Sequence, residues 1–347
     1  MSRSSPSLAH WPNFNPHPLL GSAHLQTLWP SLFRQLPSLE RTRERFELPD
    51  GDFIDLDWCA PPETRSNTPI GVLFHGLTGS SNSQYIVAMQ AMFTRQGWRS
   101  VAVNFRASSG VPNRRPQVYH AGHTDDIDAL FAALHQRFPS APLTAIGYSL
   151  GGSMLGNWLG KRDYHHYLSA AALVSVPYDL GQCSTRLDQG FSRLYRRHML
   201  NALQTLFTGK LNYFRALGDS DSQRQLERLS IFRPHTSFWT FDDEVMAPLH
   251  GFTSVHDYYN QCSAGRFLGR VTTPTLLIQS LDDPFVPTTA LPSAEKLSAQ
   301  VHTLLQPKGG HLGFWAHRHL PRRGPFWLEL TLWHWLEKTA LPQATLS

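Results

Sequence analysis

A serine stands between two glycines in the stretch Gly147-Tyr148-Ser149-Leu150-Gly151, directly after the apolar run LTAI. A serine hydroxyl is a poor nucleophile unless a base removes its proton and an acid orients that base. Glycines two residues before and two after the serine permit a tight strand-to-helix turn that presents the hydroxyl above a sheet. An ordinary turn is the alternative, because glycine and serine fill many turns. The position between a buried strand and a helix favours a nucleophile at Ser149.

Two later loops supply candidates for the base and the acid. His311 follows the apolar run VHTLLQ, and Asp282 and Asp283 follow the run PTLLIQ. Both loops come at the carboxyl ends of predicted strands, where the sites of parallel sheets gather. We predict that His311, which lies beside glycine, is the base. We predict that Asp283 is the orienting acid, with Asp282 as the alternative; in the first case Asp282 caps or braces the turn.

A third loop, FHGLTG at residues 74–79, resembles the turns that supply a backbone N–H to a developing oxyanion. We predict that the amides of Leu77 and Leu150 form the oxyanion hole. A plain strand-to-helix turn explains the glycines of this loop but not the pair His75-Gly76. We expect His75 to brace the loop rather than to take part in the chemistry.

The elements that must position these residues alternate along the chain. Short strands that are apolar along their whole length alternate with helical patterns, which indicates a parallel sheet covered by helices on both faces. The rhythm stops at Pro177, and residues 178–270 show helical segments without a clear strand. We therefore expect an α/β fold made of an N-terminal arm (1–40), a core (41–177 and 271–347) and a helical lid insertion (178–270). The predicted strands are 46–48, 53–58, 70–74, 100–105, 143–147, 171–176, 274–279 and 301–306, and the predicted helices of the core are about 84–96, 124–136, 150 onward, 291–299 and 325–338.

Composition excludes several classes of protein. The 347 residues are 41% hydrophobic and 16% charged, with a formal charge of +5. No apolar run approaches the roughly 20 residues of a membrane span, and the start of the chain lacks the apolar segment of a signal peptide. Three isolated cysteines (Cys59, Cys183 and Cys262) fit a reducing, cytoplasmic location. Basic residues form no stripe, so we expect no nucleic-acid partner, while weak peripheral contact with a membrane and the oligomeric state stay open.

The stretch from His120 to Asp126 has two further interpretations. His120 and Asp125 form an H-x4-D string of the kind found in acyltransferases, although so short a pattern arises easily by chance. The histidines and aspartates here have no recognised metal-ligand spacing, so we predict no metal and no cofactor. The simpler interpretation is a loop in which Thr124 or Asp125 caps the next helix.

With these residues in view, the chain resembles the α/β-hydrolase superfamily and, more narrowly, its YheT-like family of esterases. The narrower resemblance rests on stretches outside the three catalytic candidates. One is NPHPLLGSAHLQTLW at residues 15–29, and others are NFR at 104–106 and YHAG at 119–122. A last one is FDDE at 241–244 with APLHGF at 247–252.

The resemblance implies a serine esterase that cleaves carboxylic esters, short, medium or lipid-derived in their acyl part, without a cofactor. Two alternatives remain. The first is an acyltransferase that passes the same acyl group to an alcohol or thiol, which the H-x4-D string alone supports. The second is a binding protein on the same fold without activity, which the complete and correctly ordered set of serine, aspartate and histidine disfavours.

Overall fold

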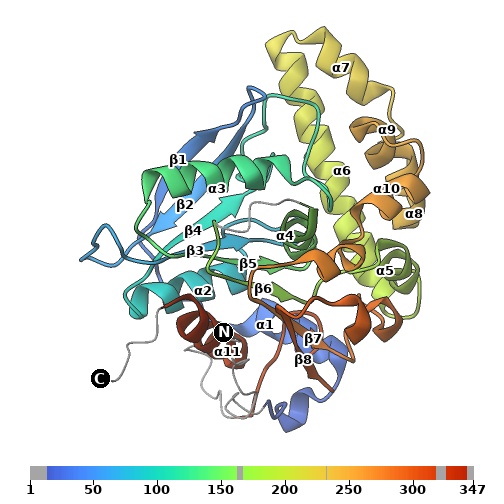
Figure 1. The fold of residues 1–347 in the computed structure, drawn as a ribbon. Helices are drawn as coiled ribbons and strands as arrows, with labels where there is room; N and C mark the ends of the chain where they lie inside the picture. The colour runs from blue at the N-terminus through green and yellow to red at the C-terminus, as the bar shows by residue number, and fades with distance from the viewer. Residues whose placement is uncertain (1–13, 162–166, 232, 318–325, 342–347) are drawn as a thin grey trace, which may run out of the picture.

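The fold is built on one sheet of eight strands in the part of the chain that the computed structural model describes, residues 14–161, 167–231, 233–317 and 326–341 (Figure 1). The strand order is β1-β2-β4-β3-β5-β6-β7-β8, and all neighbours from β4 to β8 pair in parallel. β1 and β2 form a hairpin and pair antiparallel, and β2 also pairs antiparallel with β4. The strands are β1 (Thr42–Glu47), β2 (Phe53–Cys59), β3 (Ile70–Phe74), β4 (Arg99–Asn104), β5 (Leu143–Tyr148), β6 (Ala170–Val174), β7 (Thr275–Ser280) and β8 (Val301–Gln306).

Helices cover both faces of the sheet, as the apolar strands predict (Figure 1). α3 (Asp125–Arg137) and α4 (Leu150–Lys161) bury their apolar sides on one face, where Phe131 packs against Trp158. α2 (Gln84–Arg95) and α11 (Trp327–Ala340) cover the other face, where Phe93 meets Trp333. The sheet is thus the middle layer of three, and this confirms the predicted fold class.

Strand register brings the chemically interesting loops together at one edge. Phe74 at the end of β3 is paired with Gly147 near the end of β5, so the loops that follow both strands are neighbours. Ser280 at the end of β7 is paired with Gln306 at the end of β8. The carboxyl ends of parallel strands lie on the same edge of a sheet, and the four loops therefore face one region.

Between β6 and β7 the described residues form helices and no strand, as the sequence predicts. The longest, α6, is amphipathic and ends at Gly218, whose φ of 70° terminates the helix. This group of helices lies beside the sheet, on the right in Figure 1. Its members are α5 (Leu180–Leu187), α6 (Ser192–Leu217), α7 (Ser220–Glu227), α8 (Phe238–Phe241), the π-helical turn η3 (Asp242–Met246), α9 (Ala247–His250), α10 (Val255–Cys262) and the 3-10 turns η4 (Ala264–Arg266) and η5 (Leu268–Arg270).

The helix predicted over 291–299 is wrong. Within this range the chain forms one 3-10 turn, η7 (Ala294–Lys296), and another, η6 (Thr288–Ala290), ends just before it. Pro292 explains the difference, because proline disfavours helical geometry in the residue before it, and Leu291 is extended with a ψ of 138°. The apolar spacing that suggested a helix comes from residues that alternate between extended and turn geometry.

The first described residues, 14–34, pack on the C-terminal part of the chain. This segment contains η2 (Pro18–Leu20) and α1 (Ala23–Phe33). Gln26 is fully buried, and its side-chain amide donates to the carbonyl oxygens of Leu20 and Trp315 and accepts from the Trp315 amide. Arg34 forms a bidentate ion pair with Glu329 of α11.

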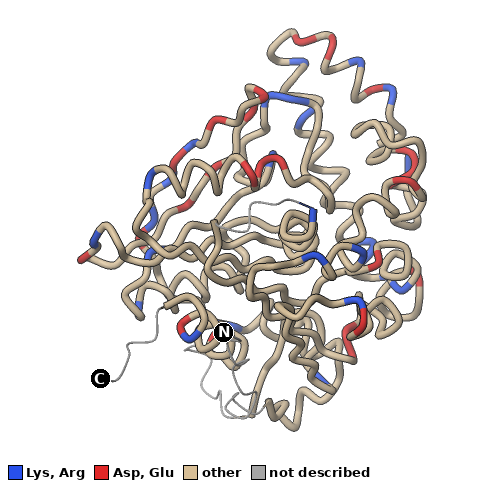
Figure 2. Tube along the Cα trace, viewed as in Figure 1, with Lys and Arg blue, Asp and Glu red and all other residues tan. Residues whose placement is uncertain are grey.

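Along the backbone trace, acidic and basic residues are interspersed, and most of them lie toward the periphery (Figure 2). Among the described residues, no helix is both long and apolar enough to cross a bilayer.

Candidate active site

Ser149 occupies the sharp corner between β5 and α4. Its φ of 50° lies in the left-handed region that non-glycine residues rarely adopt. Neighbouring glycines make the corner possible, because a Cβ at Gly147 would lie 2.6 Å from Cα of Gly152. A Cβ at Gly151 would collide with the carbonyl oxygen of His75 in the adjacent loop. The strained turn and the close approach of the two loops explain the spacing of the motif.

The structure brings the three predicted side chains into one hydrogen-bonded chain. His311 Nε2 lies 3.0 Å from Ser149 Oγ, and His311 Nδ1 lies 2.9 Å from Asp283 Oδ2. In this arrangement Nδ1–H donates to the carboxylate and Nε2 accepts from the serine hydroxyl. The Asp283 side chain is fully buried, and that of His311 nearly so. The separations and atom order are those that proton transfer from serine to histidine requires.

The two neighbouring aspartates have different partners. Asp283 Oδ1 accepts from the amides of Phe285 and Val286 at 2.8 and 3.2 Å. Its Oδ2 accepts from Gln279 Nε2 at 2.9 Å as well as from His311. Asp282 Oδ1 instead accepts from the Gly310 amide at 2.9 Å, so it braces the loop that carries the histidine.

The loop after β3 leaves one amide free beside the serine. The Gly76 amide donates to the Tyr85 hydroxyl at 3.0 Å, and the Thr78 amide donates to the Tyr119 hydroxyl at 2.8 Å. Neither the Leu77 amide nor the Leu150 amide donates a hydrogen bond within the described ranges. Leu150 opens α4, so its N–H is one of the unpaired donors that favour negative charge at a helix start.

His75 has the contacts of a brace. It is fully buried, and Nδ1–H donates to the Gly76 carbonyl oxygen at 2.7 Å, while Nε2 accepts from the Phe105 amide at 3.4 Å. Burial lowers the pKa of His75 to about 4, so the imidazole is neutral near pH 7. Both nitrogens therefore hold backbone groups and neither is directed at the serine hydroxyl.

A cavity of about 110 Å³ is lined by Ser149 and His311. Most of the other lining groups are apolar and come from the helices between β6 and β7. Polar residues also line the cavity away from the catalytic candidates, among them Ser184, Asp242 and Tyr259. Six of the apolar lining residues are Leu180, Leu187, Leu203, Leu206, Phe238 and Phe241.

The arm contributes a contact that the sequence did not reveal. Thr27 Oγ1 accepts from the His311 amide at 2.9 Å and itself donates to the Ala23 carbonyl oxygen. Tyr85, Tyr119 and Gln279 are also absent from the sequence-based site. The stretches YHAG and HLQT, quoted above for the family resemblance, contain Tyr119 and Thr27, but nothing in them indicates these contacts.

His120 and Asp125 of the H-x4-D string lie in different local settings. His120 is buried, lines the cavity and accepts from the Gly122 amide through Nδ1 at 3.3 Å. Asp125 is the first residue of α3. Thr124 is the N-cap, but its side chain makes no capping hydrogen bond. In the described ranges no group of three or more histidine, cysteine, aspartate or glutamate side chains could hold a metal ion, and Cys59, Cys183 and Cys262 are buried free thiols.

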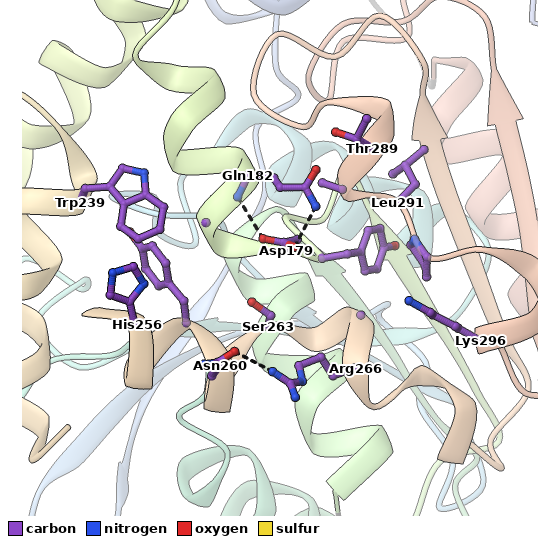
Figure 3. A pocket seen from close by; sticks show the side chains of 16 residues that line it. Asp179, Gln182, Trp239, His256, Asn260, Ser263, Arg266, Thr289, Leu291 and Lys296 are labelled. Carbon is purple, nitrogen blue, oxygen red and sulfur yellow. Dashed lines mark hydrogen bonds between the residues drawn. The ribbon is translucent and has the colours of Figure 1, made fainter. Parts of the chain in front are cut away.

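A second cavity, of about 340 Å³, is lined by other residues of α5, among them Gly181 and Gln182 (Figure 3). None of Ser149, Asp283 and His311 lines it. Several of its polar groups pair with one another, Gln182 Nε2 with Asp179 Oδ2 and Arg266 with Asn260 (Figure 3). Of the two cavities, the smaller one is therefore the one that the catalytic candidates Ser149 and His311 line.

Comparison with known proteins agrees with this geometry. Residues 72–317 match the model of the family described as "alpha/beta hydrolase fold". The chain is 39% identical over 315 residues to the Escherichia coli protein named "Putative esterase YheT", covering 91% of this chain and 90% of that one. It is 31% identical over 296 residues to "Phospholipase ABHD3" of Mus musculus, covering 83% and 70%.

Among solved structures, the esterase Pf2001 of Pyrococcus furiosus is similar with a TM-score of 0.54. The match covers 96% of this chain and 100% of that one, at 13% sequence identity. An identity this low supports the fold alone.

Proposed function

Because the chain belongs to the α/β-hydrolase family, in its YheT-like branch, we propose that this carboxylic ester hydrolase acts through Ser149, His311 and Asp283. The observation that carries the proposal is the hydrogen-bonded chain from carboxylate to imidazole to hydroxyl, at 2.9 and 3.0 Å. The strained corner at Ser149 supports it, since unfavourable backbone geometry persists where function requires it.

In the first half of the reaction, Ser149 Oγ attacks the carbonyl carbon while its proton passes to His311 Nε2. Asp283 holds the imidazole in the required tautomer and stabilises the imidazolium. The oxygen of the tetrahedral intermediate accepts from the Leu77 and Leu150 amides. His311 then returns the proton to the departing alcohol, and an acyl group stays on Ser149.

In the second half, water attacks the acyl-enzyme with His311 again as the base. Release of the carboxylic acid restores the hydroxyl. An added alcohol that competes with water would give a new ester, and product analysis in its presence measures any acyltransferase reaction.

The apolar cavity supports esters with a short or medium acyl chain, or lipid-derived esters. Relatives named as a phospholipase and a monoacylglycerol lipase fit this class. We assign the helical segment 178–270 as a lid over the cavity, residues 1–40 as an arm, and 41–177 with 271–347 as the catalytic core.

A serine-directed probe tests the proposal directly. A fluorophosphonate should label Ser149 in the purified protein, and Ser149→Ala should abolish both the label and the hydrolysis of p-nitrophenyl esters. Ser153→Ala is the matched control, because this serine lies one turn further along α4 and bonds the Pro177 carbonyl oxygen. Hydrolysis that survives in Ser149→Ala refutes the assignment.

A further inference from the structure

One carboxyl group interrupts the apolar lining of the cavity. Asp242 lines the same cavity as Ser149, together with Ser184 and Tyr259. The Tyr259 hydroxyl donates to Asp242 Oδ2 at 2.7 Å and lies 2.8 Å from Ser184 Oγ. Because the tyrosine proton goes to the carboxylate, the serine hydroxyl donates to the tyrosine. Asp242 is therefore the final acceptor in this series of hydrogen bonds.

The second carboxyl oxygen of Asp242 is left available. Oδ1 accepts no hydrogen bond within residues 14–161, 167–231, 233–317 and 326–341. Asp242 also has no ion pair within these ranges. Burial raises the pKa of Asp242 to about 7, and the Tyr259 hydrogen bond offsets only part of that cost. A desolvated carboxyl group is normally paired with a cation or neutralised. Asp242 has no cationic partner among the described residues, so its Oδ1 can still accept a hydrogen bond.

The local backbone is also unusual. Asp242 opens a π-helical turn, Asp242–Met246, which joins α8 to α9. Wide turns of this kind are rare in proteins and frequent at functional sites. The neighbouring carboxylate of Asp243 is exposed and accepts from the Val255 amide at 2.8 Å, so it serves the start of α10 instead of the cavity.

We propose that Asp242 is a specificity-determining residue that recognises a hydrogen-bond-donating group, a hydroxyl or an ammonium, on the substrate at a distance from the ester bond. Apolar pockets commonly use a small number of polar groups to fix the orientation of a ligand. The inference rests on the proposed function, since it concerns the cavity that Ser149 lines. It narrows the substrate class from apolar esters to esters with a polar group in one arm.

A structural role is the competing explanation. Ser184, Asp242 and Tyr259 come from α5, η3 and α10, so their hydrogen bonds also join three elements of the lid. A brace affects all substrates alike, whereas a recognition group affects only esters that carry the donor.

Matched esters separate these explanations. Two series of increasing length are needed, one varied in the alcohol and one in the acyl part. Each length is made with a terminal methyl, hydroxyl or ammonium group, and acid release is followed in a pH-stat. In the wild type, kcat/KM for a hydroxyl- or ammonium-terminated ester should exceed that of the methyl-terminated ester of equal length by about tenfold to a hundredfold. The comparison of the two polar termini identifies which donor is preferred.

Asp242→Asn should reduce that preference to near unity, because kcat/KM for the polar-terminated esters falls toward the value for the methyl-terminated ester of equal length. Asp243→Asn, one residue away but outside the cavity, should retain the preference. Tyr259→Phe removes the hydrogen bond between helices but keeps the acceptor, so it too should retain the preference even where it lowers stability.

Two results overturn the inference: a wild type that shows no preference in either series, or an Asp242→Asn variant that loses activity equally on all three termini. Failure of the proposed function looks different, because then the fluorophosphonate does not label Ser149 in any variant. Labelling of Asp242→Asn at the wild-type rate shows that the catalytic groups are intact.

Discussion

Three consecutive backbone amides in the loop after β3 differ in their hydrogen bonding. Tyr85 and Tyr119 accept from the amides of Gly76 and Thr78, whereas the Leu77 amide between them donates no hydrogen bond among the described residues. Thr78 has a φ of 58°, which is a strained value for a residue other than glycine. The loop would relax to another conformation if it lost the hydrogen bonds that hold it. The two tyrosines therefore act as positioning residues for the proposed oxyanion hole.

Tyr119→Phe tests this arrangement. Loss of the hydroxyl leaves the Thr78 amide without its acceptor, and the strained loop can then relax. We expect kcat to fall by about tenfold or more with little change in KM, because the loss is felt in the transition state. Affinity for a boronic acid that mimics the tetrahedral intermediate should fall by the same factor. An unchanged kcat would remove Tyr119 from this role.

The two neighbouring aspartates offer a second test. Asp283→Asn leaves the geometry nearly intact but favours the wrong imidazole tautomer, and we expect kcat to fall by about 10³- to 10⁴-fold. Asp282→Asn weakens a bond to the Gly310 amide, and we expect a loss of about tenfold or less. Steady-state kinetics on one p-nitrophenyl ester decides, and the reverse order would move the acid to Asp282.

The catalytic candidates could be predicted from the sequence because each follows a strand within a few residues. Ser149, Asp283 and His311 appear in the order that this fold imposes, and glycines mark two of the corners. The supporting residues could not be predicted in this way. Tyr119 is 41 residues from Thr78, and only the folded sheet makes them neighbours.

At the scale of elements, α6 is joined to the core by a buried lysine. Lys210 Nζ donates to the Asn113 side-chain oxygen and, at 2.6 Å, to the Arg115 carbonyl oxygen. Burial lowers the pKa of Lys210 to about 7, with Asp52 opposing and Arg106 adding to the shift. The same loop is joined to Asp52 by Asn113, so α6 shares one polar network with the turn between β1 and β2.

This network predicts a pH dependence of stability. Between the folded pKa near 7 and the ordinary value of 10.5, the unfolded chain binds a proton that the folded chain has released. The unfolding free energy should therefore rise with pH in this window through Lys210, by at most about 1.4 kcal/mol per pH unit. Urea denaturation of the wild type and Lys210→Met from about pH 7 to 10 should show a shallower rise in the variant. Lys338→Met, an exposed lysine on α11, should keep the wild-type slope.

Most elements were predictable because strands buried on both sides are apolar throughout, and β3, which is buried along its whole length, matches its predicted range, 70–74. The missing helix at 291–299 shows the limit of that reasoning. Pro292 disfavours a helix here even though the apolar residues have helical spacing. The spacing of apolar residues alone does not show which of them are extended.

At the scale of the whole molecule, the two ends of the described chain are joined. Arg34 of the arm and Glu329 of α11 form an ion pair at 3.0 Å with side chains 7% and 2% exposed. Glu329 also accepts from the Phe326 amide. Removal of one partner of a buried pair leaves an unpaired charge, which is far more costly than loss of a surface pair.

We therefore expect Glu329→Gln to lower the unfolding free energy by about 3–5 kcal/mol. Glu337→Gln on the exposed side of the same helix should change it by less than about 0.5 kcal/mol. Urea titration of the three proteins measures both effects. Equal stability of the two variants would show that the arm contributes little to the fold.

The hydrogen bond between Thr27 and His311 has a consequence for biosynthesis, since its partners are 284 residues apart. A ribosome that adds about 5–20 residues per second makes the threonine roughly 15–60 s before the histidine. Ser149 is made within that interval, 162 residues before its proposed base. The nascent polypeptide should thus be chemically silent until His311 has been made and has folded against Thr27.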